Sequence, residues 1–389
     1  MQIRLLELSS EDDSLAACAA AGRAVLDPNL RGWAALVPLE PPVLAEGLKQ
    51  AGLAVLRGAR GALVLGNLSQ LWSAGRSLAD GLERPVPRAL AAELMTRAAA
   101  VEGAAQPGEP RWFLPRGPLG PLEPGRGRTL IMGIINVTPD SFAGGFPDPQ
   151  AAIAEGLRLA AEGADLLDVG GESTRPGALP VPAAEERART EPVVRALVQA
   201  GHRVSIDTTK AEVAQAALDA GAEIVNDVSA LLRDPALGPL VARTGAALCL
   251  MHLRGTPADM QSRANYQDLL GEVQSELAQA LARAHQAGIA GDRIALDPGL
   301  GFAKTGAHNL LLLRRLRELT QLGHPLLVGA SRKSFLGKLT GKPPAERAIA
   351  SAAAAALAAA NGAAILRVHD VAATREALLV ADAVRSSTR

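Results

Sequence analysis

The sequence predicts a (β/α)₈ barrel that is preceded by a small N-terminal α/β or α+β domain. Apolar strand-like runs alternate with helical segments along the C-terminal part of the chain, and eight such runs are present. Eight strands with eight crossovers in about 260 residues match the size of this barrel. The runs are continuously apolar, as expected for a parallel sheet that is covered by helices. A doubly wound open sheet is the alternative, but it would make the count of eight accidental.

The predicted strands are, in chain order, LIMGIINV, DLLDVGG, RVSIDT, EIVNDVS, ALCLMH, RIALDPG, PLLVGAS and AILRVHD. Helical patterns follow them, for example at 211–220 and 371–384. The alanine-rich stretch 348–366 lacks the bulky apolar residues of a membrane-spanning helix. We therefore expect a packed helix there, followed by a strand, and no membrane partner.

A stretch rich in proline and glycine divides the chain. Residues 106–127 read QPGEPRWFLPRGPLGPLEPGRG, which can propagate neither a helix nor an inner strand and therefore predicts a linker. Residues 1–105 are expected to form the small domain, whose role the sequence does not indicate. Its strands are predicted at QIRLLEL and GALVLGN, and its helices at LWSAGRSLADGL and PRALAAELMTRAAAV. Residues 128–389 are expected to form the barrel.

Composition excludes several classes of partner. Lys and Arg number 40 and Asp and Glu also number 40, so no global basic field attracts nucleic acid or an anionic membrane. Hydrophobic residues make up 48% of the chain, which is ample for a sizeable core. Cys18 and Cys249 are too few for a disulfide framework or a thiolate metal site, which fits a reducing compartment. Since the first residues do not have the pattern of a signal peptide, we expect a cytoplasmic protein.

Polar side chains cluster at the C-terminal ends of the predicted strands, where such barrels build their active sites. Any one of these residues is explained equally well as a cap or turn residue. A polar residue at every strand end is harder to explain in this way, so we expect the side chains to converge in one pocket. They are Asn136, Asp168, Glu172, Asp207, Asn226, His252, Asp297, Ser331–Ser334, Arg367 and His369.

Three of these residues suit a flat heterocycle. A carboxylate accepts two N–H bonds in a plane and an amide offers both a donor and an acceptor, so Asp207, Asn226 and Asp297 can match the edge of such a ring. The glycine-rich turn DPGLGFAKT adds Phe302, whose ring can pack on the ligand or, equally well, in the core.

The last strand predicts an anion site. Arg367 and His369 share one of its faces, because side chains alternate with a period of two. They precede a helix that starts near Val371, whose free N–H groups and dipole also favour an anion. The alternatives are a salt bridge of Arg367 across the barrel mouth and a helix-capping role for His369.

Eight motifs follow one another along the predicted barrel. They are MGIINVTPDSF (132–142), DVGGESTRPGA (168–178), SIDTTK (205–210), NDVSA (226–230), LMHLRGTPADMQ (250–261), DPGLGFAKT (297–305), GASRKSFLG (329–337) and RVHDV (367–371). With these motifs, residues 129–389 resemble the dihydropteroate synthase family of the folate pathway. Eight ordered motifs of this length make coincidence negligible, whereas any one of them would be weak.

The resemblance implies a reaction and an assembly. The reaction is the condensation of 6-hydroxymethyl-7,8-dihydropterin diphosphate with 4-aminobenzoate, which gives 7,8-dihydropteroate and diphosphate and uses Mg²⁺. The assembly is a homodimer formed through barrel helices. Family members also bind sulfonamides in the aminobenzoate site, so these compounds are implied as inhibitors.

The resemblance also assigns roles by position. The pterin would be held by Asp207, Asn226, Asp297 and Lys333, with Met251 and Phe302 packed near it. Diphosphate would bind to Arg367, His369 and Asn136, and Asn136 would also contact Mg²⁺. The aminobenzoate site would be bordered by Thr174, Arg175, Pro176 and Ser334. The catalytic residues would be Lys333, Asp207, Arg367 and His369, and the mobile loops would be 138–148 and 173–181.

The chemistry is consistent with these roles. Diphosphate can leave from a CH₂ group on an electron-rich dihydropterin because the ring delocalises the developing cation, so no strong protein base is required. Arg367 and His369 would stabilise the departing anion, and Asp207 and Asp297 would accommodate the positive charge. Lys333 fits as a hydrogen-bond donor to the pterin edge rather than as a nucleophile. Loop closure would exclude water, which competes with the weak aromatic amine.

Two features depart from the family pattern. The first loop reads DSFAGGF at 140–146 where family members commonly read DSFSDGG, so the usual aspartate before the glycine pair has no direct counterpart. Asp148 is a candidate substitute from a shifted position. The N-terminal 125 residues are the second departure, because the ordinary family member begins close to the first barrel strand.

Two other functions are open to the same residues. A pterin-dependent methyltransferase uses a similar barrel and a similar Asp and Asn pocket, but it has no diphosphate to hold, so SRKSF and RVHD argue against it. A non-catalytic pterin-binding protein would fit the altered loop and the extra domain. The complete set of anion-site residues argues against this second alternative.

Overall fold

The computed structural model describes most of the C-terminal part of the chain and scattered positions before it. In the C-terminal part, the described residues are 128–138, 145–146, 148–175 and 178–387. Before these, they are 4–8, 17, 21, 32–38, 48, 53–57, 61–66, 70–71, 94, 97 and 114.

The chain forms two compact units. The first unit comprises Met1–Gln106 together with Arg317–Gly323, and the second comprises Pro107–Leu316 and His324–Arg389. The sequence pattern did not indicate that Arg317–Gly323 belongs with the N-terminal residues. The predicted linker over 106–127 lies outside the described residues except for Leu114.

The first unit contains a four-stranded antiparallel sheet with the strand order β1-β2-β4-β3. Its strands are β1 Arg4–Leu8, β2 Gly32–Pro38, β3 Ala54–Arg57 and β4 Gly61–Gly66. The predicted strands at QIRLLEL and GALVLGN are confirmed as β1 and β4, whereas β2 and β3 were not predicted. The two predicted helices, LWSAGRSLADGL and PRALAAELMTRAAAV, lie mostly outside the described residues.

The edge strand of this sheet binds a side chain from Arg317–Gly323. The amide of Gln321 accepts a hydrogen bond from the backbone N–H of Leu5 at 2.8 Å and donates one to the carbonyl of Leu5 at 3.1 Å. A side-chain amide thus satisfies the backbone groups that an edge strand otherwise leaves unpaired. Strand residues that include Leu6, Leu8 and Leu63 pack with Ala17 and Ala21 into a small apolar core.

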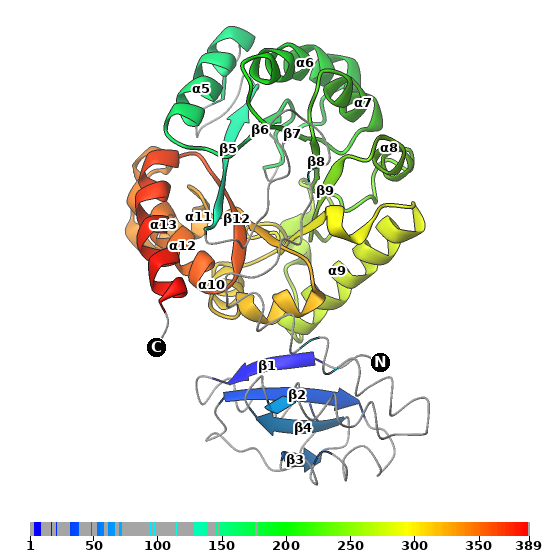
Figure 1. Ribbon diagram of the computed structural model, residues 1–389, viewed down its shortest axis with the longest axis vertical. Coiled ribbons are helices and arrows are strands. Elements are labelled where there is room, and N and C mark those ends of the chain that lie inside the picture. The colour runs from blue at the N-terminus through cyan, green and yellow to red at the C-terminus, as the bar shows by residue number, and fades with distance from the viewer. Residues whose placement is uncertain are drawn as a thin grey trace. The chain divides into compact units, whose positions relative to one another are not determined.

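The second unit contains a closed parallel barrel with the strand order β10-β11-β12-β5-β6-β7-β8-β9 (Figure 1). Its strands are β5 Leu130–Asn136, β6 Leu166–Gly170, β7 Val204–Asp207, β8 Ile224–Asp227, β9 Ala247–Met251, β10 Ile294–Asp297, β11 Leu326–Val328 and β12 Ala363–Val368. Pairing between β9 and β10 is parallel, like that of the other neighbours, and closes the ring. The predicted (β/α)₈ barrel is therefore confirmed, and the alternative of an open doubly wound sheet is wrong.

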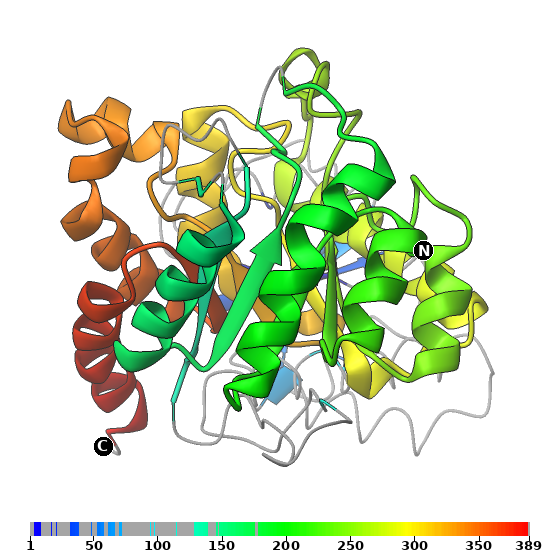
Figure 2. The same cartoon turned by 90° about the horizontal axis from the view of Figure 1, so that it is seen from above.

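The helices lie around the outside of the ring of strands (Figure 1), and Figure 2 shows the same barrel turned by 90°. They are α5 Pro149–Ala161, α6 Ala183–Gln199, α7 Ala211–Asp219, α8 Leu237–Thr244, α9 Leu269–Gln286, α10 Gly306–Arg314, α11 Ser334–Thr340, α12 Ala348–Ala360 and α13 Val371–Ser386. Short 3₁₀ segments are η1 Met260–Arg263, η2 Gly291–Arg293, η3 Leu316–Leu322 and η4 Pro344–Glu346. The helix and strand that were predicted over 348–366 are confirmed as α12 and β12. In the described part of the chain, no helix is long and apolar enough to cross a bilayer.

Local signals fix several helix ends. Asp148 is the N-cap of α5, where its carboxylate accepts a bond from the N–H of Gln150, and a proline follows at the start of the helix. Thr305 and His308 form a reciprocal capping box at the start of α10. Gly245 adopts a left-handed conformation with φ 68° at the C-cap of α8, which a glycine tolerates without strain.

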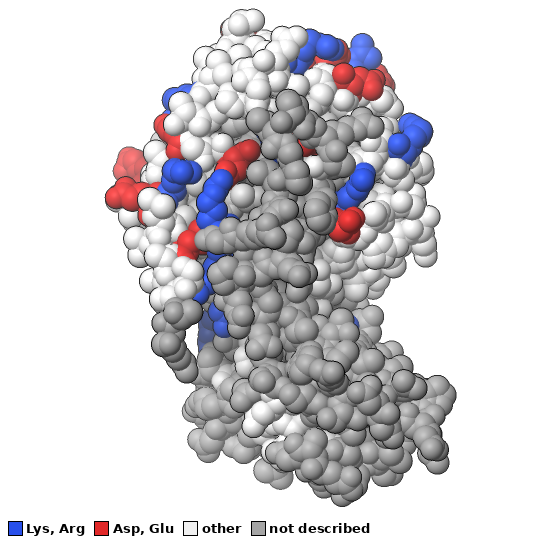
Figure 3. All heavy atoms as spheres, viewed as in Figure 1, with Lys and Arg blue, Asp and Glu red and all other residues white. Residues whose placement is uncertain are grey.

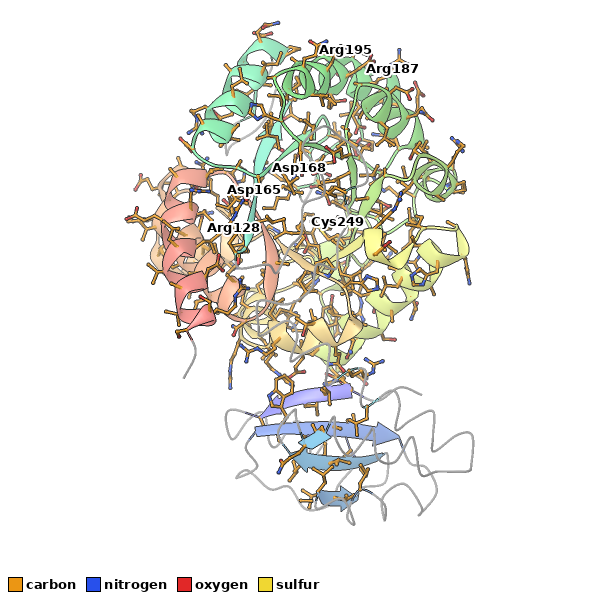
Figure 4. The ribbon with its side chains drawn as sticks, viewed as in Figure 1. Arg128, Asp165, Asp168, Arg187, Arg195 and Cys249 are labelled. Atoms are coloured by element: carbon orange, nitrogen blue, oxygen red, sulfur yellow. The ribbon has the colours of Figure 1, made fainter. Side chains whose placement is uncertain are left out.

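Apolar side chains fill the interior of the barrel. The buried cluster consists of Leu114, Leu130, Met132, Leu166, Ile224, Ala247, Cys249, Ala295, Leu327 and Ile365. Burial raises the pKa of the Cys249 thiol well above its usual value, so this cysteine serves as a small apolar residue. Figure 4 labels it inside the ring of strands. Since the interior is packed, a ligand has to bind at a mouth of the barrel.

One buried ion pair stabilises the opposite end of the barrel. Arg203 directly precedes β7 and Glu223 directly precedes β8, and their side chains pair at 2.8 Å with exposed fractions of 3% and 7%. Surface pairs on α6 are different: Arg187 and Glu191 are 3.7 Å apart and 50% and 33% exposed. On the face drawn in Figure 3, the acidic and basic side chains of the described surface residues lie beside one another. Neither positive nor negative charge dominates this face.

Arg203→Met should destabilise the barrel because it leaves the buried Glu223 carboxylate unpaired. We expect the free energy of unfolding, measured by urea denaturation, to fall by about 3–5 kcal/mol. Arg187→Met is the matched control and should cost less than about 1 kcal/mol, because the exposed pair is screened by water. Equal effects of the two substitutions would contradict the assignment of Arg203 as a structural residue.

Candidate active site

A cavity of about 540 Å³ lies at the C-terminal ends of the barrel strands. It is lined by all the described residues to which the resemblance gave roles: Asn136, Thr174, Arg175, Asp207, Asn226, Met251, Asp297, Phe302, Lys333, Ser334, Arg367 and His369. Pro176 lies outside the described residues. Asp168 and His252 were also expected to converge here, but neither lines the cavity. The separate roles given to the lining residues stay predictions.

Strand register sets the residues that are predicted to bind a ring in two neighbouring pairs. Asp207, at the end of β7, pairs with Asn226 on β8, and Asp297, at the end of β10, pairs with Met251 on β9. The carboxylate of Asp297 accepts the N–H of Gly299 at 2.6 Å. Burial raises the pKa of Asp297, and the ammonium of Lys333 opposes this effect. Two carboxylates and an amide therefore face one side of the cavity.

Arg367 connects this side of the cavity with Asp168 on β6. Its Nε donates to Oδ2 of Asp168 at 2.5 Å, and its Nη2 donates to Oδ2 of Asp207 at 2.6 Å. Asn226 also donates to Oδ2 of Asp168, at 3.1 Å. Asp168 is fully buried, and Figure 4 labels it within the ring of strands. The salt bridge that was considered as an alternative for Arg367 is therefore present, and its anion-binding role remains a prediction.

The charges in this group shift one another's pKa values. Burial raises the pKa of Asp207 to about 7, an effect that Arg367 opposes and Asp168 reinforces. Burial lowers the pKa of Arg367, but Asp168 and Asp207 more than offset this, so the guanidinium stays charged. Burial therefore makes Asp207 harder to ionise than an exposed aspartate, whereas Arg367 remains a fixed cation.

His369 is held by Ser331 from the end of β11. The Ser331 hydroxyl lies 3.0 Å from Nδ1 of His369 and accepts the backbone N–H of His369 at 3.1 Å. Burial, together with the nearby cations Arg332 and Arg367, lowers the pKa of His369 to about 3. The N-cap position of α13 is occupied by Asp370, so the helix-capping alternative for His369 is wrong. His369 faces the cavity as a neutral imidazole.

Lys333 follows β11 and reaches toward the loop after β10. Its Nζ donates to the carbonyl of Leu300 and lies 4.7 Å from the centre of the Phe302 ring. Burial lowers the pKa of Lys333 to about 8, while Asp297 opposes the shift. It is therefore still mostly protonated at neutral pH, which suits the predicted role of a hydrogen-bond donor.

Glu172 holds the two ends of the second loop together. Its carboxylate accepts the N–H of Val181 at 3.0 Å, across the loop 173–181. Lys210 forms ion pairs with both Glu172 and the buried Glu186. Thr174 and Arg175, which border the cavity, are thereby carried on a loop whose base is fixed to the barrel.

The first loop is described only in part. Gly145 forms an isolated bridge with Asn136, and the N–H of Phe146 donates to the carbonyl of Asn136 at 2.8 Å. Residues 139–144, which include most of the altered DSFAGGF motif, lie outside the described part. Asp148 caps α5 and is exposed, so its carboxylate already has a structural role.

Several cavity residues were not predicted. Among them, Arg347 comes from the start of α12 and donates to the carbonyl of Arg332 at 2.8 Å, which supports the turn that carries Lys333. Thr138 is 5% exposed, and within the described part of the chain its hydroxyl has no hydrogen-bond partner. Thr138 lies in the motif MGIINVTPDSF and begins the predicted loop 138–148, which was the available signal. Arg347 lies in none of the recognised motifs, so nothing in the sequence indicated it.

The fold is that of a barrel enzyme, and its cavity brings together residues that suit a flat heterocycle and an anion. The model of the family described as pterin binding enzyme matches residues 132–369, and the chain belongs to this family. Among its relatives is the dihydropteroate synthase of Mycobacterium leprae, which is 49% identical over 262 residues, or 65% of this chain and 92% of the relative. The predicted family resemblance is confirmed.

Solved structures agree with this assignment. Yersinia pestis dihydropteroate synthase, in a complex with a sulfonamide drug, is 44% identical and has a TM-score of 0.65 over 67% of this chain and 95% of its own. Xanthomonas albilineans dihydropteroate synthase, in a complex with 7,8-dihydropteroate, is 44% identical and has a TM-score of 0.60 over 67% and 94%.

The low pKa of His369 predicts that its imidazole stays neutral in acid. The unfolded chain binds this proton near pH 6.5 and the folded chain only near pH 3, so the stability that His369 contributes is lost as the pH falls between these values. In NMR titration, we expect the folded signal of His369 to remain unchanged down to about pH 4. The same residue in urea-unfolded protein, the control, should titrate near its ordinary value. A midpoint between pH 6 and 7 in the folded protein would contradict this.

Proposed function

We propose that this chain condenses 6-hydroxymethyl-7,8-dihydropterin diphosphate with 4-aminobenzoate to give 7,8-dihydropteroate and diphosphate. The observation that carries the proposal is the convergence of Asp207, Asn226 and Asp297 with Arg367 and His369 in one cavity. One group matches a ring edge and the other an anion, and the pterin diphosphate has both. That the relative from Xanthomonas albilineans is solved with 7,8-dihydropteroate supports the proposal.

In the proposed reaction, the C–O bond between the pterin CH₂ group and diphosphate breaks, and the amine nitrogen of aminobenzoate forms the new C–N bond. Diphosphate departs with the bonding electron pair toward Arg367 and the neutral imidazole of His369. After the bond forms, the amine nitrogen loses one proton to solvent. The carboxylate of Asp207, which accepts a hydrogen bond from Arg367, can stabilise the positive charge that develops on the ring.

We further propose that Mg²⁺ assists this reaction. The residues of the cavity fit an ion that is held mainly by the phosphates of the substrate. Mg²⁺ in such sites typically takes one or two ligands from the protein, and phosphate and water supply the others. Asn136 lines the cavity, and the buried hydroxyl of Thr138 lies close by in the chain. In the described residues, no group of three or more acidic, histidine or cysteine side chains could form a protein cage. When bound, the ion would supply charge neutralisation on the leaving group.

The direct test is a product assay. Purified protein is incubated with the pterin diphosphate, radiolabelled 4-aminobenzoate and Mg²⁺, and dihydropteroate is separated and counted. We expect product to form, to disappear with EDTA and to return when Mg²⁺ is added in excess. A sulfonamide should compete with 4-aminobenzoate. Ligand binding without any product would refute the synthase and favour a non-catalytic pterin-binding protein. Methyl transfer from methyltetrahydrofolate would favour the methyltransferase alternative.

The two ends of the pocket can be separated by substitution. His369→Leu should raise the Kd for the pterin diphosphate about tenfold and change the Kd for the same pterin without phosphates less than about twofold. Asp297→Asn should weaken both ligands, because an amide cannot accept two N–H bonds from the ring edge. Calorimetry measures both constants. If His369→Leu weakened both ligands equally, His369 would not belong to the anion end.

We propose that the enzyme is a homodimer that buries the outer face of α12 and α13, and that it acts in the cytoplasm. This face exposes large apolar side chains: Ile349, Leu357, Leu379, Val380 and Val384 are 60–79% exposed. The two helices lie side by side on the outside of the barrel (Figure 1). A cluster of exposed apolar residues on a soluble surface is typical of an interface.

Leu379→Glu should convert the proposed dimer to a monomer, because the charge would be buried at the interface without a partner. Sedimentation equilibrium measures the mass directly. Leu157→Glu on α5, where the leucine is 41% exposed, is the matched control and should leave the mass unchanged. A wild-type protein that sediments as a monomer would refute the dimer.

A further inference from the structure

Lys304 is a buried lysine behind the cavity. It lies in the loop between β10 and α10, the loop that supplies Phe302 to the cavity, and only 3% of the residue is exposed. Its Nζ lies 2.9 Å from Nδ1 of His252 and donates to the carbonyl of Phe302 at 3.1 Å. Burial lowers the pKa of Lys304 to about 7, although Asp297 opposes the shift. A lysine is rarely buried to this extent unless its ammonium group has hydrogen-bond partners that compensate for the loss of water.

The partners of Lys304 form a chain across two strand ends. The side chain of His252, which follows β9, is fully buried, and its Nε2 lies 3.1 Å from Oε2 of Glu276 on α9. An ammonium group has only donors, so Nδ1 of His252 accepts and the ring proton sits on Nε2, facing Glu276. Burial lowers the pKa of His252 to about 4, which keeps this ring neutral at neutral pH.

The loop that Lys304 holds has an unfavourable backbone. Gly299 and Gly301 have φ values of 67° and 84°, and Ala303 has a φ of 48°, which is disfavoured for a residue with a side chain. A Cβ atom at position 299 would lie 2.1 Å from the carbonyl oxygen of His252, so the loop passes directly against the end of β9. The hydroxyl of Tyr266 pins the loop a second time by donating to the carbonyl of Ala303 at 3.0 Å.

This loop determines the position of two predicted pterin residues. Phe302 is part of the loop, and Lys333 donates to the carbonyl of Leu300 within it. The Lys333 ammonium also lies over the Phe302 ring, 4.7 Å from its centre. A shift of the loop would therefore move the aromatic ring and the donor together.

We propose that Lys304 is a positioning residue for pterin recognition, which fixes the loop that carries Phe302 and supports Lys333 by bonding His252 and the Phe302 carbonyl. Lys304 acts through these residues and does not itself touch the substrate. Its loss should weaken binding of the pterin ring and leave the predicted aminobenzoate site largely unchanged, because Thr174 and Arg175 lie on the loop after β6 and Ser334 begins α11. The inference rests on the proposed pterin condensation.

Lys304→Met tests the proposal, because methionine has a similar length and no donor. The probe is 6-hydroxymethyl-7,8-dihydropterin without phosphates, and its Kd is measured by calorimetry on the full chain. We expect the Kd to rise about tenfold, the loss of a buried hydrogen bond, and the KM for 4-aminobenzoate to change less than about twofold. Lys338→Met, at an exposed position of α11, is the control and should behave as wild type.

A second pair of variants gives a result even if Lys304→Met does not fold. His252→Asn keeps an acceptor near the position of Nδ1, whereas His252→Leu removes it. We expect the leucine variant to lose pterin affinity about tenfold and the asparagine variant to lose less than about threefold. The proposal would be overturned if the pterin Kd were unchanged in folded Lys304→Met and His252→Leu. It would also be overturned if the pterin Kd and the KM for 4-aminobenzoate rose by the same factor. Failure of the proposed function itself is distinguishable, because wild-type protein would then form no product.

Discussion

Closure of the eight-stranded parallel sheet is the constraint on which the rest of the structure depends. Once β9 pairs with β10, every strand ends on the same rim, and the helices cover the outer faces. The interior is filled mainly by apolar side chains such as Met132 and Ile365, while the buried Asp168 is paired with Arg367. Charged side chains that belong to the strands are therefore concentrated at the rim, and the cavity is a direct consequence of the fold.

Concentrated charges at the rim require mutual compensation. Asp168, Asp207 and Asp297 are buried, and burial alone would disfavour their ionised forms. Arg367 compensates the first two by bonding both, and Lys333 stands nearest to the third. Burial still raises the pKa of Asp207 although Arg367 opposes this shift. Preorganised charges of this kind can stabilise a charged ligand without first having to be reoriented.

The sequence predicted those parts of the fold and the site that follow from strand periodicity. Each continuous apolar run became a barrel strand, because both faces of a parallel sheet are covered. β11 is shorter than its predicted run, since only Leu326–Val328 pair before the chain turns to present Ser331 and Lys333. The cavity residues at strand ends were predictable for the same reason. In the first unit, by contrast, β2 was missed because its sequence GWAALVP is rich in glycine, alanine and proline, which are depleted in strands. β3 was missed because it has only four residues.

Side chains that act across the sequence were beyond prediction. Arg347 bonds carbonyls fourteen and fifteen residues earlier, and Gln321 bonds the edge strand β1 from 316 residues away. Lys304 follows an apolar turn and has the pattern of a surface lysine, although it is buried. Such contacts depend on the three-dimensional arrangement of loops, and residue spacing does not encode them.

Arg367 does not belong to only one end of the pocket, whether the end that is predicted to hold the ring or the end that is predicted to hold the anion. The family resemblance gave it a role toward diphosphate, with a salt bridge across the barrel mouth as the alternative, and its guanidinium does bond Asp207, which is predicted to hold the ring. Removing it would leave Asp168 and Asp207 buried without their cation, and the pKa of Asp207 would rise further. Substitution of Arg367 therefore disturbs both ends of the pocket at once. His369, which is neutral and held by Ser331 outside this group of charges, is the residue through which the anion end can be tested separately.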